Sequence, residues 1–159
     1  MTDAIADRTT VYRLAIPLRR PSVHATGRCT HAEPVILAVE LRDGTVGWGE
    51  APSPTGTMSN AVESIATCIR DVYVPALTSF HATSFAEALE QIDAMPWHDM
   101  RDGCAAAARA AVELALLDAS LQRYGRTMDD AVRWMDLPGF GRPGSLPRMR
   151  FTAVPRISA

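Results

Sequence analysis

Apolar residues follow two different spacings along this chain. Near the start they come in short runs rich in β-branched residues, which predict three strands, Val11–Ile16, Val35–Leu41 and Thr45–Trp48. Farther on they recur with the helical period, and the helices expected from this pattern span residues 61–73, 85–95, 103–124 and 128–135. The order predicts an α+β fold, a three-stranded antiparallel β-meander followed by a bundle of three to four helices.

The second and third predicted strands are separated by a strong turn signal. Asp43-Gly44 is typical of a two-residue hairpin turn, because glycine adopts a positive φ at low cost. The octapeptide Asp43–Glu50 is therefore predicted to be a hairpin, which leads into the loop Ala51–Asn60.

Two of the predicted helices begin with the same signal. Asn60 precedes Glu63 by three residues, and Ser84 precedes Glu87 by the same distance, so both pairs are predicted to form capping boxes. Pro75 is expected to end the first of these helices. The third helix has an alanine-rich face, which favours close packing against a neighbouring element.

Length and composition favour one main domain. The 159 residues, 47% of them hydrophobic, are sufficient for one sizeable core. Residues 1–10 lack periodicity and are expected to be a disordered or frayed N-terminus, whereas residues 11–136 are expected to form the domain. Residues 137–159 are expected to be a Pro/Gly-rich linker with the start of a further strand at Met149–Val154.

The net charge argues against nucleic acid and membranes as partners, and the cysteine usage argues against an oxidising compartment. The formal net charge of −2 gives no bulk attraction to nucleic acid or to an anionic membrane, so neither is expected as a partner. The three cysteines are widely separated, and no signal-peptide pattern or membrane-spanning apolar run is present. We therefore expect a cytoplasmic protein with free thiols.

The chain contains no lysine, and all sixteen basic side chains are arginines. Lysine-dependent chemistry, such as Schiff-base formation or proton abstraction by a desolvated amine, is thereby excluded, since a guanidinium stays charged.

Two further motifs lack the context that their function requires. Gly139–Gly144 matches the dinucleotide-binding pattern, but its prolines break the required strand-to-helix context. Cys29, His31 and Glu33 alternate without a further ligand pair, and no metal site is expected.

Three acidic residues are the remaining candidates for chemistry. Glu50, directly after the hairpin glycines, is interpreted as an anchor of the following loop, with a functional role as the alternative. Glu113 and Asp118 are five residues apart and do not share a helix face. Each is expected to pair with an arginine or to cap a neighbouring loop. No catalytic residue is therefore predicted in this chain.

Four stretches together resemble a known family. Ile16–Pro21, Glu33–Leu41, Asp43–Glu50 and Ala110–Ala119 are similar, in order and spacing, to the N-terminal capping domain of the mandelate racemase and muconate-lactonizing branch of the enolase superfamily. The amino-acid sequence of these stretches is most similar to the sequences of dipeptide epimerases, N-acylamino acid racemases and muconate cycloisomerases. The loop after Pro52 departs from the expected form, which leaves the substrate class open.

The resemblance implies that the domain covers the mouth of a (β/α)-barrel, where a barrel-bound magnesium ion and barrel bases act next to a substrate carboxylate. Two lid loops, Leu18–Glu33 and Ala51–Asn60, would enclose a small-molecule carboxylate. The substrate-binding residues expected in these lids are His24, Thr26, Arg28, Thr55, Gly56 and Thr57.

The sequence is expected to stop where the barrel of the family begins, so the chain alone is expected to be catalytically incompetent and to bind no cofactor.

Two explanations for a capping domain without its barrel remain open. The chain is part of an isomerase, as a truncation or as one subunit of a split enzyme, or it is an orphan domain that binds a ligand or a protein. Its expected partners are a barrel domain or a second copy of itself.

Overall fold

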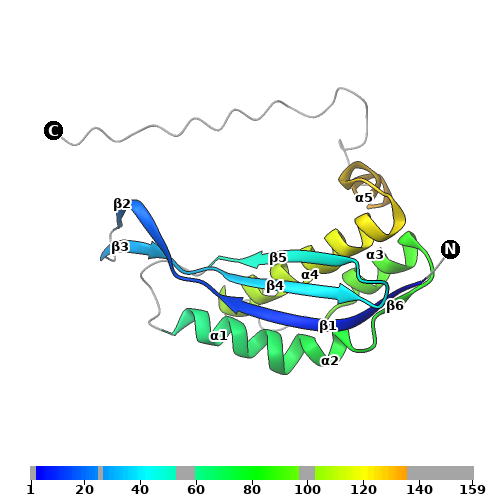
Figure 1. Ribbon diagram of the computed structural model, residues 1–159, viewed down its shortest axis with the longest axis horizontal. Helices are drawn as coiled ribbons and strands as arrows, with labels where there is room; N and C mark the ends of the chain where they lie inside the picture. The colour runs from blue at the N-terminus through cyan, green and yellow to red at the C-terminus, as the bar shows by residue number, and fades with distance from the viewer. Residues whose placement is uncertain (1–2, 25–26, 53–59, 97–102, 136–159) are drawn as a thin grey trace. The chain divides into compact units, whose positions relative to one another are not determined.

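A computed structural model of the protein describes residues 3–24, 27–52, 60–96 and 103–135. The chain divides into two compact units, residues 1–126 and 127–159. Strands and helices of the first unit follow in the order β1 (Ala4–Arg13), β2 (Ile16–His24), β3 (Gly27–Ala32), β4 (Val35–Leu41), β5 (Val46–Ala51), α1 (Ala61–Cys68), η1 (Ile69–Tyr73), α2 (Val74–Leu77), β6 (His81–Ala82), α3 (Phe85–Asp93) and α4 (Gly103–Tyr124). The antiparallel strands and the helices confirm the α+β class (Figure 1).

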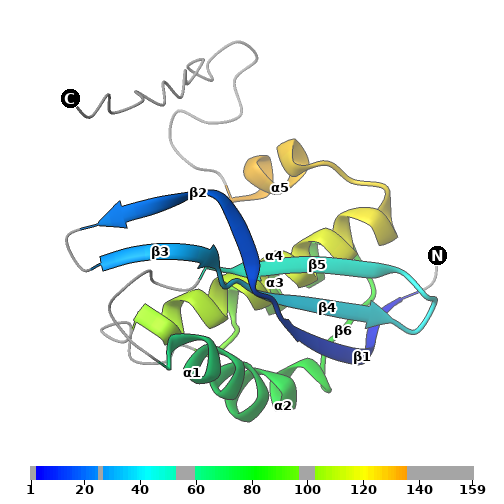
Figure 2. The ribbon, with the colours of Figure 1, turned by 60° about the vertical axis from the view of Figure 1, so that its left-hand side comes forward.

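The strands form two separate sheets instead of one three-stranded meander. The larger sheet has four strands in the order β5-β4-β1-β6, and all its pairs are antiparallel. Helices α1, α2 and α4 cover one face of it, and the β2–β3 hairpin projects from one end (Figures 1 and 2). The core lies between this sheet and the helices, and its largest fully buried side chains include those of Leu37, Leu41, Ile65, Ile69, Tyr73, Leu77 and Leu116.

Strand β1 begins earlier than predicted. Residues 4–10, expected to be frayed, form the first part of this strand, and the Ala4 side chain is fully buried. β1 pairs with β6 at Ala4 and Ile5 and with β4 from Ala6 to Arg13, so its backbone groups find partners along its length despite its weakly apolar sequence. At this position tertiary pairing outweighed local propensity.

The connection expected over Leu18–Glu33 is largely a β-hairpin. β2 and β3 pair from Ile16↔Ala32 to His24↔Gly27, with an irregularity between Pro17 and Ser22. Pro17, which directly follows the first predicted strand Val11–Ile16, lies inside β2. A proline is tolerated here because this two-stranded sheet consists of edge strands only, so its missing N–H breaks no central ladder.

The hairpin at Asp43–Glu50 is confirmed, but its turn differs from the prediction. The Leu41 N–H donates to the Thr45 carbonyl at 2.8 Å and the Gly44 N–H donates to the Leu41 carbonyl at 2.9 Å, so three residues form the loop. Within this loop, Gly44 adopts a left-handed backbone conformation, with φ +87°, which glycine tolerates at low cost.

The Asp43 carboxylate is held at this turn. The Thr45 backbone N–H, together with the Arg123 guanidinium, holds the pKa of Asp43 below its usual value.

Gly47 and Gly49 of β5 lie directly against helix α4. A Cβ at Gly47 would lie 2.7 Å from the Ala119 Cβ, and a Cβ at Gly49 would lie 2.8 Å from the Ala115 backbone nitrogen. Ala111, Ala115 and Ala119 recur at helical spacing, so the two glycines meet a stripe of small residues on α4. The predicted close packing of the alanine-rich face is confirmed, with β5 as the neighbour.

The first predicted helix continues past Pro75. Helix α1 runs into the π-helical turn η1 and then into α2, which has Pro75 in its first turn. In a regular α-helix the proline ring would collide with the carbonyl four residues earlier. The π turn, in which the Val74 N–H donates to the Ile69 carbonyl, changes the register just before the proline and lets the helix continue.

The two predicted capping boxes have different outcomes. Asn60 makes no side-chain cap, since its φ of −119° and ψ of 16° lie outside the extended region that a capping residue adopts. Ser84 does cap α3, and its Oγ accepts from the Glu87 N–H at 3.2 Å. The Glu87 carboxylate reaches one residue farther back and accepts from the Thr83 hydroxyl at 2.7 Å and from the Thr83 N–H at 2.8 Å, and these two hydrogen bonds lower the pKa of Glu87.

In the second unit, α5 (Met128–Trp134) is described and confirms the predicted fourth helix. Its capping box between Thr127 and Asp130 was not predicted from the sequence. The strand expected at Met149–Val154 lies outside the described residues. Among the described helices, none combines the length and the apolar run that crossing a membrane requires.

Candidate functional site

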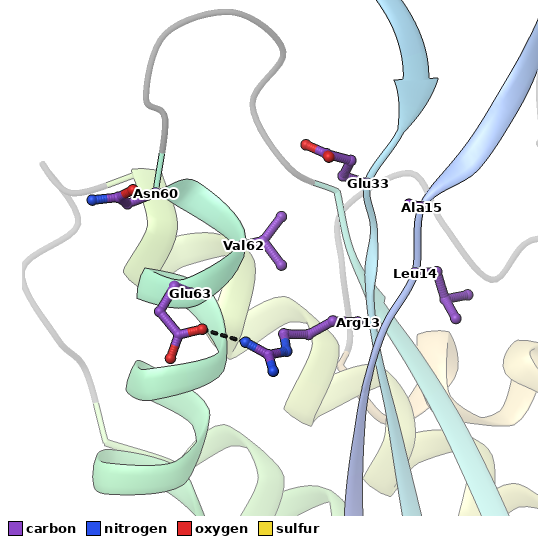
Figure 3. Close-up of a pocket in the computed structure, with 7 residues that line it drawn as sticks. All are labelled: Arg13, Leu14, Ala15, Glu33, Asn60, Val62 and Glu63. Atoms are coloured by element: carbon purple, nitrogen blue, oxygen red, sulfur yellow. Dashed lines mark hydrogen bonds and ion pairs between the residues drawn. The ribbon is translucent and has the colours of Figure 1, made fainter.

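The candidate site is an open pocket at the end of the sheet from which the β2–β3 hairpin projects. Its volume is about 360 Å³, and it lies between the C-terminal end of β1 and the start of α1 (Figure 3). The residues that line it are Arg13, Leu14, Ala15, Glu33, Asn60, Val62 and Glu63. Glu33 directly follows β3 and Asn60 directly follows residues 53–59, so the pocket adjoins both predicted lids.

An ion pair crosses the pocket from the sheet to the helix. The Arg13 guanidinium, at the end of β1, binds the Glu63 carboxylate of α1 (Figure 3). Both side chains are more than half exposed, so the pair contributes little stability, roughly 0 to 1 kcal/mol. Its effect is positional, because it joins the strand that leads into one lid to the helix that follows the other.

The remaining polar groups of the pocket are suited to forming hydrogen bonds with a bound ligand. Glu33 is exposed, and the Asn60 side chain makes no capping hydrogen bond to α1. The Val62 side chain supplies apolar contact. Among the described residues, the lining offers an arginine, two carboxylates and an amide, which are suited to binding and orienting a polar group.

The predicted substrate-binding residues are only partly placed by the structure. Thr26, Thr55, Gly56 and Thr57 lie outside the described residues, and their expected role stays a prediction. His24 ends β2, where its backbone pairs with that of Gly27. Arg28 pairs with Val23 across the same hairpin, and its side chain is exposed. The hairpin thus presents Arg28 to solvent beside the predicted lid tip.

The acidic residues of α4 have structural partners: Glu113 pairs with an arginine, as expected, whereas Asp118 binds the backbone of strand β5 instead of an arginine or a loop. Glu113 accepts from the Arg109 Nε at 2.6 Å, and Asp118 accepts from the Trp48 N–H at 2.9 Å. Gln122 adds a hydrogen bond of 3.0 Å to the Val46 carbonyl. The side chains of α4 therefore satisfy backbone groups on the outer edge of β5, an edge that would otherwise invite pairing with another strand.

The anchoring role expected for Glu50 stays a prediction. Glu50 is exposed at the end of β5, opposite Ile36 of β4. Within the described part of the chain its carboxylate has no hydrogen bond or ion pair. The loop that it is expected to anchor includes residues 53–59, which lie outside that part.

The described residues do not fit a magnesium site. Among them, no three His, Cys, Asp or Glu side chains converge as metal ligands would. Of the alternating Cys29, His31 and Glu33, the Cys29 thiol donates to the His31 backbone carbonyl at 2.7 Å.

Arg109 is a buried charged residue of α4 that sequence reasoning missed. It is 4% exposed, and its guanidinium donates to the carbonyl oxygens of Met95 at 2.9 Å and Asp93 at 3.3 Å, at the C-terminal end of α3. A cation at this position satisfies the free carbonyls of the last turn and complements the helix dipole. An arginine within an otherwise alanine-rich run was the signal available in the sequence.

Comparison with known proteins decides the family. The model of the mandelate racemase/muconate lactonizing enzyme N-terminal domain matches residues 7–130. The chain belongs to this family. Residues 7–130 include Arg13, Glu33 and Glu63, so the family match covers the residues that line the pocket as well as the octapeptide hairpin and α4.

Curated relatives of this family domain are epimerases. The chain is 34% identical over 113 residues to the L-Ala-D/L-Glu epimerase of Bacillus subtilis, covering 71% of this chain and 29% of that protein. It is also 34% identical over 108 residues to the L-Ala-D/L-amino acid epimerase of Populus trichocarpa, covering 67% and 24%.

The solved structure of a substrate-liganded complex of the Bacillus subtilis epimerase matches the fold. The TM-score is 0.59 at 32% identity, and the match covers 75% of this chain and 32% of that chain. The chain therefore spans between about a quarter and a third of the length of these relatives.

Proposed function

We propose that this chain supplies the substrate-capping and specificity domain of an enolase-superfamily isomerase, a racemase, epimerase or cycloisomerase that acts next to a carboxylate. The observation that carries the proposal is the family match over residues 7–130 in relatives about three times as long. In this role Leu18–Glu33 and Ala51–Asn60 enclose the substrate, and the larger domain supplies the bases and the magnesium ion.

The charge of the β2–β3 hairpin supports an acidic substrate. Between Leu14 and Ala32 the chain has three arginines and no aspartate or glutamate, although the whole chain has a net charge of −2. Arg19, Arg20 and Arg28 are all exposed. A guanidinium binds a carboxylate through two parallel hydrogen bonds, so this hairpin is suited to a distal carboxylate of the substrate.

A chimera tests the proposed specificity role. Residues 1–135 of this chain would replace the matching segment of the Bacillus subtilis epimerase. In the chimera we expect Arg28→Ala to raise KM for dipeptides with an acidic side chain by about tenfold or more, because a charge-assisted hydrogen bond is lost. Neutral dipeptides should be affected less than about twofold. Steady-state racemisation assays give both values.

Arg42→Ala is the matched control, since Arg42 is an exposed arginine in the turn between β4 and β5 and lies outside the β2–β3 hairpin. It should change KM for acidic dipeptides less than about twofold. Equal effects of both substitutions, or an equal effect on acidic and neutral dipeptides, would show that Arg28 does not recognise the substrate.

A further inference from the structure

Helix α1 begins without the kind of side-chain cap that begins α3 and α5. Ser84 caps α3 and Thr127 caps α5, whereas the Asn60 side chain makes no capping hydrogen bond to α1. The Ser64 N–H makes the first intrahelical bond, at 2.9 Å to the Asn60 carbonyl, and the backbone N–H groups before it receive no cap from the Asn60 side chain. A first turn that lacks this cap opens at a lower free-energy cost.

The Glu63 carboxylate, which would complete a capping box, is bound to the sheet instead. In a capping box the third helical residue accepts a hydrogen bond from the backbone N–H of the capping residue. Here the Glu63 carboxylate binds the Arg13 guanidinium at the end of β1 (Figure 3). The first turn of α1 is therefore held from the sheet and not from its own N-terminus.

The apolar core supports the first turn of α1 less than it supports the rest of the helix. Ile65 is fully buried, whereas in the first turn the buried side chain is the small one of Ala61, and Glu63 is more than half exposed. Because little apolar area holds this turn, even the modest energy of an exposed ion pair changes how often the turn opens by several-fold.

Arg13 starts from a fixed point of the backbone. It pairs with Val35 of β4, and the N–H of the next residue, Leu14, donates to the Pro34 carbonyl at 3.1 Å. These contacts lie at the base of the β2–β3 hairpin, because Ile16 pairs with Ala32 just beyond them. The Arg13 side chain therefore joins the base of the hairpin to the start of α1.

We propose that Arg13 is a positioning residue. Through Glu63 it holds the first turn of α1 in place relative to the base of the β2–β3 hairpin, and it thereby maintains the pocket between them in the shape that the substrate needs. The inference rests on the proposed function. Direct binding of a substrate carboxylate by Arg13 is the rival role, and it predicts the opposite effect at Glu63, because removing this carboxylate would then free Arg13 for the substrate.

Amide hydrogen exchange in the 159-residue chain tests the first part of the proposal. We expect Arg13→Met and Glu63→Gln each to speed exchange of the Ser64 amide by about three- to fivefold, and the double variant to add little to either, because both remove one interaction. Arg13→Lys should keep most of the protection, since an ammonium also pairs with a carboxylate. In about 1 M salt the difference between Arg13→Met and the unsubstituted chain should shrink.

Arg8→Met is the matched control. Arg8 lies on the same strand and is also an exposed arginine in an ion pair, but its partner is Glu40 of β4 and not a residue of α1. Its loss should change exchange of the Ser64 amide less than about 1.5-fold.

Steady-state kinetics of the chimera with the Bacillus subtilis epimerase test the second part. We expect Arg13→Met and Glu63→Gln each to raise KM for dipeptides about threefold and to change kcat less than about twofold, because the pocket affects binding and not the chemical step. Arg13→Lys should restore KM, and Arg8→Met should leave both constants unchanged.

Three results would overturn the proposal. The first is unchanged exchange of the Ser64 amide in Arg13→Met, or an equal increase in Arg8→Met. The second is faster exchange with an unchanged KM, which would limit Arg13 to a structural role. The third is a KM that Glu63→Gln lowers while Arg13→Met raises it, which would make Arg13 a substrate ligand. An inactive unsubstituted chimera would contradict the proposed function, whereas the exchange experiment would still decide what holds the first turn of α1.

Discussion

A single methyl group added at Gly49 is expected to cost the domain about 3 kcal/mol or more, or to prevent folding. The Cβ of Gly49→Ala would overlap the Ala111 carbonyl oxygen and lie 2.8 Å from the Ala115 nitrogen. Both atoms belong to the backbone of a 22-residue helix, so no side-chain rotation relieves the overlap. Urea denaturation followed by circular dichroism measures the loss.

Gly103→Ala is the control for this substitution. Gly103 is the first residue of α4, and nothing lies within 4 Å of a Cβ built on it. Alanine there should leave the free energy of unfolding unchanged or raise it by up to about 1 kcal/mol, because it restricts the unfolded chain and favours the helix. Equal stability of Gly49→Ala and Gly103→Ala would contradict the described packing of β5 on α4.

The second large effect is expected at Arg109. Arg109→Met keeps much of the side-chain volume but leaves the Glu113 carboxylate and the carbonyls of Met95 and Asp93 without this donor. Since the guanidinium is buried, we expect a loss of about 3 kcal/mol in the free energy of unfolding. Arg109→Lys should recover only part of it, because an ammonium cannot reproduce the planar fork.

Arg133→Met provides the comparison. Arg133 pairs with Asp129 at the same four-residue spacing on a helix, but both side chains are more than half exposed. Its loss should cost less than about 0.5 kcal/mol. The same denaturation experiment compares the two arginines, and an Arg109→Met variant as stable as Arg133→Met would show that the buried guanidinium does not hold α3 to α4.

Elements whose signal is local could be predicted from the sequence. The helix Gly103–Tyr124 was predicted with the observed bounds, because its periodicity extends over 22 residues. The octapeptide hairpin was also predicted, since Gly44 dominates its turn. The three-residue loop was not, because the choice between loop lengths depends on hydrogen bonds that the turn residues alone do not determine.

Features that depend on distant residues could not be predicted. Residues 4–10 form a strand only because two other strands flank them, and Pro75 stays helical only because a π turn precedes it. The pocket illustrates the same limit. The ion pair between Arg13 and Glu63 joins residues fifty positions apart, and no spacing in the sequence indicates it.

The family signature has a physical explanation that the sequence alone did not give. Within the octapeptide, Gly47 and Gly49 permit contact with α4, Trp48 exposes its ring to solvent, and Asp43 binds Arg123 at 2.9 Å. Most of the octapeptide therefore fixes the position of β5 on α4. Glu50, at its end, adjoins the segment of the second predicted lid.

The central claim is that this chain encloses a substrate whose chemistry is performed by a larger domain. The most direct test is exchange of the substrate α-proton in deuterated water, with magnesium and with dipeptides or N-acylamino acids, followed by NMR. We expect no exchange above the buffer rate with the 159-residue chain and measurable exchange with the folded chimera. Exchange catalysed by the 159-residue chain alone, or a folded chimera that exchanges no α-proton, would contradict the claim.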